Sequence, residues 1–354
     1  MQDLIDQFSE RIRSAAKHKQ PLRLRGGGSK DFYGQTPVGE VLDTRGYAGV
    51  IDYEPTELVI TVRCGTPLAE LEAVLRAQGQ YLAFEPPHFG AAATVGGMVA
   101  AGLSGPRRQA AGAVRDFVLG VRMLDGRANT VSFGGRVMKN VAGYDVSRAL
   151  AGSLGTLGLI LDVSFKVPPL PVAEATQKLE VPQDKALELL NHWGGKPMPI
   201  SASVWADGNL AVRLSGAESA VKAACAAIGG ETVEEGAAAA YWRGIREQTD
   251  DFFNNDRPLW RLSLPSVAPP VALPDAQLIE WGGALRWLAS NADARTLREA
   301  AAQAGGHATL FRAKDRSAGV FAPLVPALAN VHRNLKRAFD PEGIFNPGRM
   351  YPDL

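Results

Sequence analysis

Three consecutive glycines follow a short strand-like segment near the N-terminus, in the stretch Arg25-Gly26-Gly27-Gly28-Ser29-Lys30. Because glycine has no side chain, such a loop lets backbone N–H groups converge on an anion. The flanking cations and the hydroxyl are suited to phosphate. The stretch is not a Walker loop, and Asp31 breaks a GxGxxG register. Taken alone, it is also consistent with a flexible turn.

Two further glycine segments follow in the first half of the chain. One is Ala93-Thr94-Val95-Gly96-Gly97-Met98, which comes after the stiff Glu85-Pro86-Pro87. The other is Gly152-Ser153-Leu154-Gly155-Thr156-Leu157-Gly158-Leu159-Ile160, with glycine at every third position before an apolar strand. Each could also serve tight strand packing. Three such elements in this order are hard to explain by packing alone and favour a site for a flat or phosphorylated ligand.

This ordered set resembles the FAD domain of the vanillyl-alcohol-oxidase superfamily, from about Pro21 to Pro171 and again in the tail. The resemblance implies that the first two segments hold the pyrophosphate, through Arg25, Gly26, Gly27, Gly28, Ser29, Lys30, Thr94, Val95, Gly96 and Gly97. It places Gly102 and Ser104 near the flavin, and Gly155, Gly158 and Ile160 near the ribose and adenine. The expected cofactor-binding set is completed by Pro86, Ala93, Gly152, Thr156, Asn346 and Arg349.

The attachment of the cofactor is also implied by the resemblance. Relatives that tether FAD usually do so through a His or Cys near the flavin ring, often in the first phosphate loop. Residues 25–30 contain neither. We therefore expect non-covalent FAD, with His88 as the alternative tether.

Three other segments narrow the resemblance: residues 112–120, Lys139 to Asp145, and the end from Phe345 to Tyr351. Together with the length, they resemble the smaller FAD-binding subunit of bacterial glycolate oxidases, the GlcE type. That family implies oxidation of glycolate to glyoxylate with two partners, a catalytic FAD subunit and an iron–sulfur subunit. Lys139 to Asp145 is expected either to shape the flavin site or to be a capped turn between strands.

A chain of 354 residues exceeds one ordinary core and predicts two domains. We expect an α+β fold in which a two-lobed FAD-binding domain of the PCMH type carries a cap with an antiparallel sheet. The expected parts are the FAD-binding domain at 1–171, the cap at 172–329, and a C-terminal segment, 330–354, that returns to the first domain. The linker is Pro168-Pro169-Leu170-Pro171.

The cap contains two similar units, 202–230 and 278–306, each with the pattern strand, turn, strand, helix. The units predict an antiparallel sheet with helices on one face, and coincidence in Ala/Gly-rich sequence is the alternative. Helical spacing also predicts an amphipathic N-terminal helix, a helix after Pro67 with Thr66 as its N-cap, and a helix from Pro326 to Phe339.

Composition argues against several classes of function. The net charge is +1 and 21% of residues are charged, so nothing indicates binding to nucleic acid. No window approaches the roughly 18 apolar residues of a membrane span, and the N-terminal helix is not a signal peptide. We expect a cytoplasmic protein, whose association with the inner face of the membrane would come through partners. Two cysteines, Cys64 and Cys225, are too few for an iron–sulfur cluster, and no metal site is expected.

Oxidation of a 2-hydroxy acid needs a proton acceptor and a cation for the carboxylate. The superfamily's catalytic dehydrogenases carry GDGNxH-like and EHG-like signatures in the second domain, and neither string occurs here. Among five scattered histidines only His307 is a candidate, with Arg312 five positions on. Strand alternation would point these two side chains to opposite faces. The sequence alone therefore does not identify the catalytic residue.

Three classes of function stay open. The first is an accessory FAD subunit that passes electrons between a catalytic flavoprotein and an iron–sulfur partner, or supports the catalytic flavin structurally. The second is a self-sufficient FAD oxidase or dehydrogenase of a small hydroxy acid or alcohol, with His307 or His88 as base. The third is a binding scaffold whose flavin site is no longer used. Because the catalytic signatures are absent, we expect the first.

Overall fold

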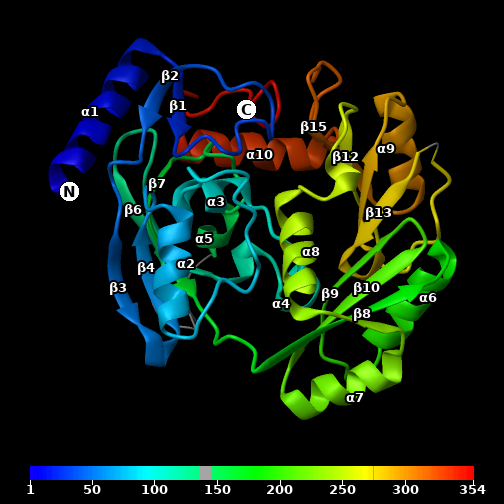
Figure 1. The fold of residues 1–354 in the computed structure, drawn as a ribbon. Coiled ribbons are helices and arrows are strands. Elements are labelled where there is room, and N and C mark those ends of the chain that lie inside the picture. The colour runs from blue at the N-terminus through cyan, green and yellow to red at the C-terminus, as the bar shows by residue number, and fades with distance from the viewer. Residues whose placement is uncertain (136–144, 274) are drawn as a thin grey trace.

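The computed structural model describes residues 1–135, 145–273 and 275–354. Its strands form a five-stranded and an eight-stranded antiparallel sheet and a separate parallel pair, which confirms the expected α+β class. In Figure 1 the first sheet lies in the blue and cyan half of the molecule, and the second in the green to orange half. Most of the segment from Lys139 to Asp145 lies outside the described residues. None of the described helices is long and apolar enough to cross a bilayer.

The first lobe begins with α1 (Gln2–His18), which buries Ile5, Phe8 and Ile12 at helical spacing. The parallel pair consists of β1 (Leu22–Arg25) and β2 (Glu40–Asp43). The sheet has the order β3-β4-β7-β5-β6, with bounds Val50–Glu54, Val59–Arg63, Leu159–Lys166, Val118–Leu124 and Thr130–Gly134. The helices are α2 (Leu68–Ala77), α3 (Val95–Ala101), α4 (Arg108–Ala111) and α5 (Val146–Ala149).

The sequence misplaces the start of α2. The helix begins at Leu68, and the residue before it is Pro67, so the assignment of Thr66 as N-cap is wrong. The Thr66 hydroxyl instead accepts the backbone N–H of Gly49 at 2.8 Å. Because that partner lies 17 residues away, a local capping pattern could not reveal it. The buried face of Leu68, Leu71 and Leu75 is as predicted.

The second lobe is built on the eight-stranded sheet, in the order β11-β8-β10-β9-β13-β14-β12-β15. The strand bounds, in chain order from β8, are Ala173–Glu180, Ile200–Ala206, Asn209–Gly216, Glu231–Val233, Leu259–Ser263, Gln277–Glu280, Leu285–Ala289 and His307–Arg312. The helices are α6 (Gln183–Gly194), α7 (Glu218–Ile228), α8 (Glu235–Glu247) and α9 (Ala294–Gln303). The division into domains at residues 171 and 329 stays a prediction.

The two stretches with a repeated sequence pattern form hairpins at the middle of this sheet. They are β9–β10 followed by α7, and β13–β14 followed by α9, with β9 and β13 paired to each other. Helices α6, α7 and α9 pack on one face, against residues such as Val212 and Leu288. Helix α8, which the repeat did not predict, packs on the opposite face between the lobes. Its Trp242 and Ile245 share a cluster there with Trp287.

A buried ionic network joins the two lobes. The carboxylate of Glu85, in the first lobe, accepts a hydrogen bond from Arg213 of β10 at 2.9 Å and from Arg107 at 3.3 Å. Arg107 also donates to Glu174 of β8 at 2.6 Å. Although burial would raise the pKa of Glu85, the two guanidinium groups hold it below its ordinary value. The network therefore holds the second sheet against the first lobe, on the face of the sheet that is turned toward that lobe.

The C-terminal helix α10 (Pro326–Phe339) has the bounds that helical spacing predicts. After it, the chain returns to the first lobe and pairs with β1, where Leu22 donates to Ile344 and Asn346 donates to Leu22. The Lys336 ammonium supports this return by donating to Thr156, Asp340 and Phe345 at 2.7–2.8 Å. The tail is thereby fixed beside the loop that follows β1.

Candidate cofactor site

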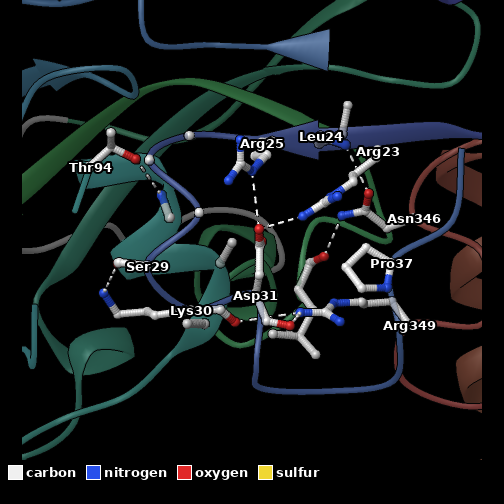
Figure 2. Close-up of a pocket in the computed structure, with 17 residues that line it drawn as sticks. Arg23, Leu24, Arg25, Ser29, Lys30, Asp31, Pro37, Thr94, Asn346 and Arg349 are labelled. Carbon is white, nitrogen blue, oxygen red and sulfur yellow. Dashed lines mark hydrogen bonds and ion pairs between the residues drawn. The ribbon is translucent and has the colours of Figure 1, made fainter. Parts of the chain in front are cut away.

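Two adjoining hollows lie where β1, α3 and the C-terminal tail meet. Figure 2 shows the first, around the loop after β1. The first hollow is lined by residues 23–31 with Pro37, Thr94, Gly97, Ala100, Ala101, Leu154, Asn346 and Arg349. The second shares part of that wall and continues along Thr44, Cys64, Gly96, Gly155, Gly158, Leu159 and Ile160. The structure thus brings together the three glycine segments and the tail.

The glycines of the first loop are required by close packing. A Cβ atom at Gly27 would lie 1.5 Å from the carbonyl oxygen of Ala92, and one at Gly26 would lie 2.1 Å from the Thr94 hydroxyl. A Cβ atom at Gly96 would lie 2.7 Å from the Cβ of Cys64. The first two glycine segments therefore pack directly on each other. This leaves backbone, instead of side chains, along the wall of the hollow.

Two arginines on β1 face the first hollow, and one of them was missed by the sequence analysis. Arg23 and Arg25 both form ion pairs with Asp31, as the dashed lines in Figure 2 show. Because residues two apart on a strand share a face, Arg23 could have been inferred from the position of Arg25. The Asp31 carboxylate therefore orients both guanidinium groups toward the loop that follows β1. Together with Lys30 and Arg349 they leave an excess of positive charge around the hollow.

Lys30 carries a charge that is sensitive to its surroundings. Its ammonium lies 3.1 Å from the carbonyl oxygen of His88 and 3.3 Å from the Ser29 hydroxyl. Burial lowers the pKa of Lys30 to about 8, an effect that the nearby Glu247 carboxylate opposes. An anion bound in the hollow would favour the charged form further.

The C-terminal tail completes the wall through two side chains. Asn346 accepts a hydrogen bond from the backbone of Leu24 at 2.8 Å and donates to the carbonyl of Leu154 at 2.7 Å. Arg349 donates to the carbonyl groups of Gln35 and Asp31. Asn346 therefore links the first and third glycine segments, whereas Arg349 braces the loop.

The second hollow is smaller and less polar than the first. A Cβ atom at Gly158 would lie 2.1 Å from the Met123 side chain and 2.6 Å from the Leu124 carbonyl oxygen, so glycine is required before β7. Cys64, which the sequence analysis did not assign to the site, lies in its wall. Burial raises the pKa of the Cys64 thiol to about 12, so it stays protonated near neutral pH.

Other expected site residues lie around the hollows without lining them. Val95 is buried in the core, and the Thr156 hydroxyl donates to the carbonyl of Ser153. A Cβ atom at Gly102 would lie 2.7 Å from the Cα of Gly152, so these two glycines let α3 and the third segment approach each other. Ser104 lines a separate cavity between the lobes. Pro86 and Ala93 line none of the described hollows.

Neither candidate histidine lines the two hollows. His88 directs its ring at Glu72, with Nε2 3.1 Å from the carboxylate. His307, the first residue of β15, pairs with Ser263 of β12 at the start of the strand and is exposed. Although the residue is exposed as a whole, partial burial of its ring and then the charge of Arg261 lower the pKa of His307. Among the described residues, no group of three or more His, Cys, Asp or Glu could hold a metal ion.

The donor set fits FAD. The first hollow offers backbone from a glycine loop, a hydroxyl and several cations, which suit a pyrophosphate. The second offers apolar and glycine surface, which suits a nucleoside. Both hollows share Leu24, Gly97 and Leu154, so one extended ligand can occupy both.

Comparisons with known proteins agree with this geometry. Residues 4–149 match the family described as the FAD binding domain. The solved structure of an alkyldihydroxyacetonephosphate synthase superposes with a TM-score of 0.67 and 16% identity, covering 96% of this chain and 74% of that chain. At this identity the likeness shows the fold alone.

Two relatives make the comparison more specific. Glycolate oxidase subunit GlcD of Bacillus subtilis is 27% identical over 173 residues, which are 48% of this chain and 37% of that subunit. Glycolate oxidase subunit GlcE of Escherichia coli is 49% identical over 352 residues, which are 99% of each chain. That identity extends over almost all of both chains, and residues 4–149 also match the FAD binding domain. This protein therefore belongs to the family of glycolate oxidase subunit GlcE.

Proposed function

We propose that this chain is the FAD-binding subunit of a multi-subunit glycolate oxidase, in which it works with a catalytic FAD subunit and an iron–sulfur subunit. The complex would convert glycolate to glyoxylate, in the cytoplasm. The observation that carries the proposal is the 49% identity with glycolate oxidase subunit GlcE over 99% of both chains.

FAD, when bound, supplies a two-electron acceptor. The part played by this chain is to hold it without a covalent bond. Loop 25–30 and Lys30 would take the phosphates, and Asn346 would hold the loop against the third glycine segment. Gly155, Gly158 and Ile160 would take the adenosine half.

An accessory role agrees with what the sequence lacks. It carries neither of the two signature strings of the catalytic dehydrogenases, and its two cysteines are too few for an iron–sulfur cluster. A flavin held here would therefore receive or deliver electrons through other subunits. We infer that it either passes electrons between the catalytic flavoprotein and the iron–sulfur subunit or supports the catalytic flavin structurally.

The lone FAD-loaded chain is expected to keep its flavin oxidised with glycolate or D-lactate, and activity is expected to appear only with the partner subunits. Anaerobic mixing, followed at the flavin absorbance band, measures this, and reduction by dithionite serves as the control that the flavin can be reduced. Bleaching by glycolate within seconds would contradict the accessory role. His307→Ala would then test the self-sufficient dehydrogenase, because its loss of bleaching would identify the base.

The FAD is expected to be released by acid precipitation, with the yellow colour in the supernatant. The loop at 25–30 contains neither His nor Cys, the His88 ring is engaged with Glu72, and the Cys64 thiol stays protonated. Colour that remains with the pellet would show a covalent bond, and mass spectrometry of the His88 peptide would identify its position.

The affinity for FAD is expected to fall as the pH rises through about 8, because Lys30 of the free protein then loses its proton. Below that pH the ammonium is present and attracts the phosphates. Above it, binding must first take up a proton, which costs up to about tenfold in affinity per pH unit. Lys30→Arg keeps the charge and should give a flat profile in FAD titrations between pH 7 and about 10. An unchanged slope in this variant would place the titrating group elsewhere.

A further inference from the structure

One peptide group links the second lobe to a cation of the first hollow. It joins His88 to Phe89, just before the second glycine segment, and is called the 88–89 peptide below. Its carbonyl oxygen accepts a hydrogen bond from the Lys30 ammonium at 3.1 Å, and its N–H group donates to the Glu247 carboxylate of α8 at 2.9 Å. Lys30 lines the first hollow, whereas Glu247 lies outside its described wall. The peptide therefore connects a carboxylate of the second lobe with an ammonium that faces the expected phosphates.

The Glu247 carboxylate accepts two further hydrogen bonds. The backbone N–H of His88 donates to the same oxygen as Phe89 does, at 3.0 Å, and the Nε–H of Arg246 donates to the other oxygen at 2.8 Å. The side chain of Glu247 is 17% exposed, so these bonds are largely shielded from water. Hydrogen bonds to an ionised acceptor are roughly twice as strong as neutral ones. Glu247 therefore fixes the orientation of the 88–89 peptide.

Phe89 has a backbone conformation that needs such support. Its φ of 52° lies in the left-handed region, which is unfavourable for a bulky residue. Rotation of the 88–89 peptide to a negative φ would relieve this strain, and it would turn the His88 carbonyl away from Lys30. The hydrogen bond to Glu247 opposes that rotation, as does the packing of the Phe89 ring against Phe32, with ring centroids 5.3 Å apart. Without the carboxylate, the strained peptide loses the acceptor of its N–H group.

The charge of Glu247 also acts on Lys30 directly. Burial lowers the pKa of Lys30, and the Glu247 carboxylate opposes this shift. The other charged or titratable groups around Lys30 and its partners are Arg246 of α8, His88, Arg312 of β15, Arg349 of the tail and Asp31. Glu247 thus supports the ammonium in two ways, by its charge and by the orientation of the carbonyl that accepts from it.

We infer that Glu247 is a positioning residue for FAD, a carboxylate of the second lobe that holds the Lys30 ammonium at the phosphates through the 88–89 peptide. The inference rests on the proposed function, in which loop 25–30 binds the pyrophosphate. It adds that FAD affinity depends on the docking of the second lobe, although no residue of α8 lines the two hollows. Because such coupling is reciprocal, bound FAD should also hold the two lobes together.

The test is a titration of the apo-protein with FAD, followed by flavin fluorescence, for wild type, Glu247→Gln and Lys30→Met. Glutamine has a single acceptor oxygen, so it cannot serve both Phe89 and Arg246. Glu247→Gln should weaken FAD binding roughly 10-fold at pH 7, and by no more than Lys30→Met does. Glu235→Gln is the matched control, because Glu235 lies exposed at the start of the same helix.

Two further readouts separate positioning from a general loosening of the lobes. In the Lys30→Met background, Glu247→Gln should have little further effect on FAD affinity, because its route to the cofactor is already lost. The pH at which the FAD affinity begins to fall, about 8 in wild type, should be lower in Glu247→Gln, because the charge that opposes the effect of burial on Lys30 is gone. A purely structural contact would weaken binding equally at every pH.

A second variant covers the case in which circular dichroism shows that Glu247→Gln is not folded. Glu247→Asp keeps the charge but shortens the side chain, so it should weaken FAD binding and keep the pH profile of wild type.

The possible results separate this inference from the proposed function. A chain that binds no FAD would overturn both, whereas wild-type affinity in Lys30→Met would overturn only the inference. The inference would also be wrong if Lys30→Met bound FAD weakly while a folded Glu247 variant bound it as tightly as wild type, or more tightly. Equal losses from Glu247→Gln in the wild-type and Lys30→Met backgrounds would show that its effect bypasses Lys30, and would contradict the inference too.

Discussion

Gly27→Val is expected to remove FAD from the protein. A Cβ atom at this position would lie 1.5 Å from the Ala92 carbonyl oxygen, so the first two glycine segments must move apart. The backbone N–H groups of the loop then lose their convergence on the phosphates. Loss of two charge-assisted hydrogen bonds lowers affinity roughly 100-fold or more. The measurement is the ratio of flavin to protein after purification, followed by titration of the apo-protein with FAD.

The control for this variant is Gly194→Ala. Gly194 ends α6, has no heavy atom within 4 Å of an added Cβ, and lies in the second lobe. It should keep wild-type flavin content. Overpacking at Gly27 costs about 1–3 kcal/mol of stability, so circular dichroism must show that the variant is folded. Should it unfold, Arg25→Met removes a cation of the first hollow without moving the backbone. Full flavin occupancy in a folded Gly27→Val protein would show that the pyrophosphate lies elsewhere.

Asp340→Ala is expected to lower the free energy of unfolding by about 3–5 kcal/mol, as the loss of one partner of a buried ion pair does. The Asp340 carboxylate accepts hydrogen bonds from Lys336 at 2.7 Å and from the backbone N–H groups of Ile344 and Phe345. Its removal leaves a buried ammonium without a counter-charge and two N–H groups without acceptors. Urea unfolding of the apo-protein measures the loss.

The same substitution should also weaken FAD binding, because Asn346 directly follows this network and links the first and third glycine segments. Asp353→Ala is the control, since its ion pair with Arg333 is largely exposed and such pairs contribute about 0–1 kcal/mol. If the free energy of unfolding of Asp340→Ala were within about 1 kcal/mol of the wild-type value, the tail would be held by apolar packing instead.

Local sequence patterns were sufficient to predict the glycine segments and several helices. Helix α10 runs from Pro326 to Phe339 as predicted, because the proline at its start and the helical spacing of its apolar residues are local properties. The resemblance to FAD-binding proteins also rested on short contiguous strings, and the match over residues 4–149 confirms it. Local patterns failed at the start of helix α2, because Thr66 does not cap the helix. Its hydroxyl accepts a hydrogen bond from the backbone N–H of Gly49 instead.

Features that depend on distant residues could not be read from any one stretch. Asp31 pairs with both arginines of β1, and Asn346 reaches Leu24 across 322 residues, yet no spacing rule connects these positions. The cavity between the lobes is a stronger case, because Arg261, Glu280 and Trp287 come from three different strands of one sheet. Strand register sets which side chains face each other, and the docking of the lobes sets which of them lose contact with water. Both follow from packing of the whole chain, so the raised pKa of Glu280 and the unpaired Nε–H group of Arg261 arise only once the chain has folded.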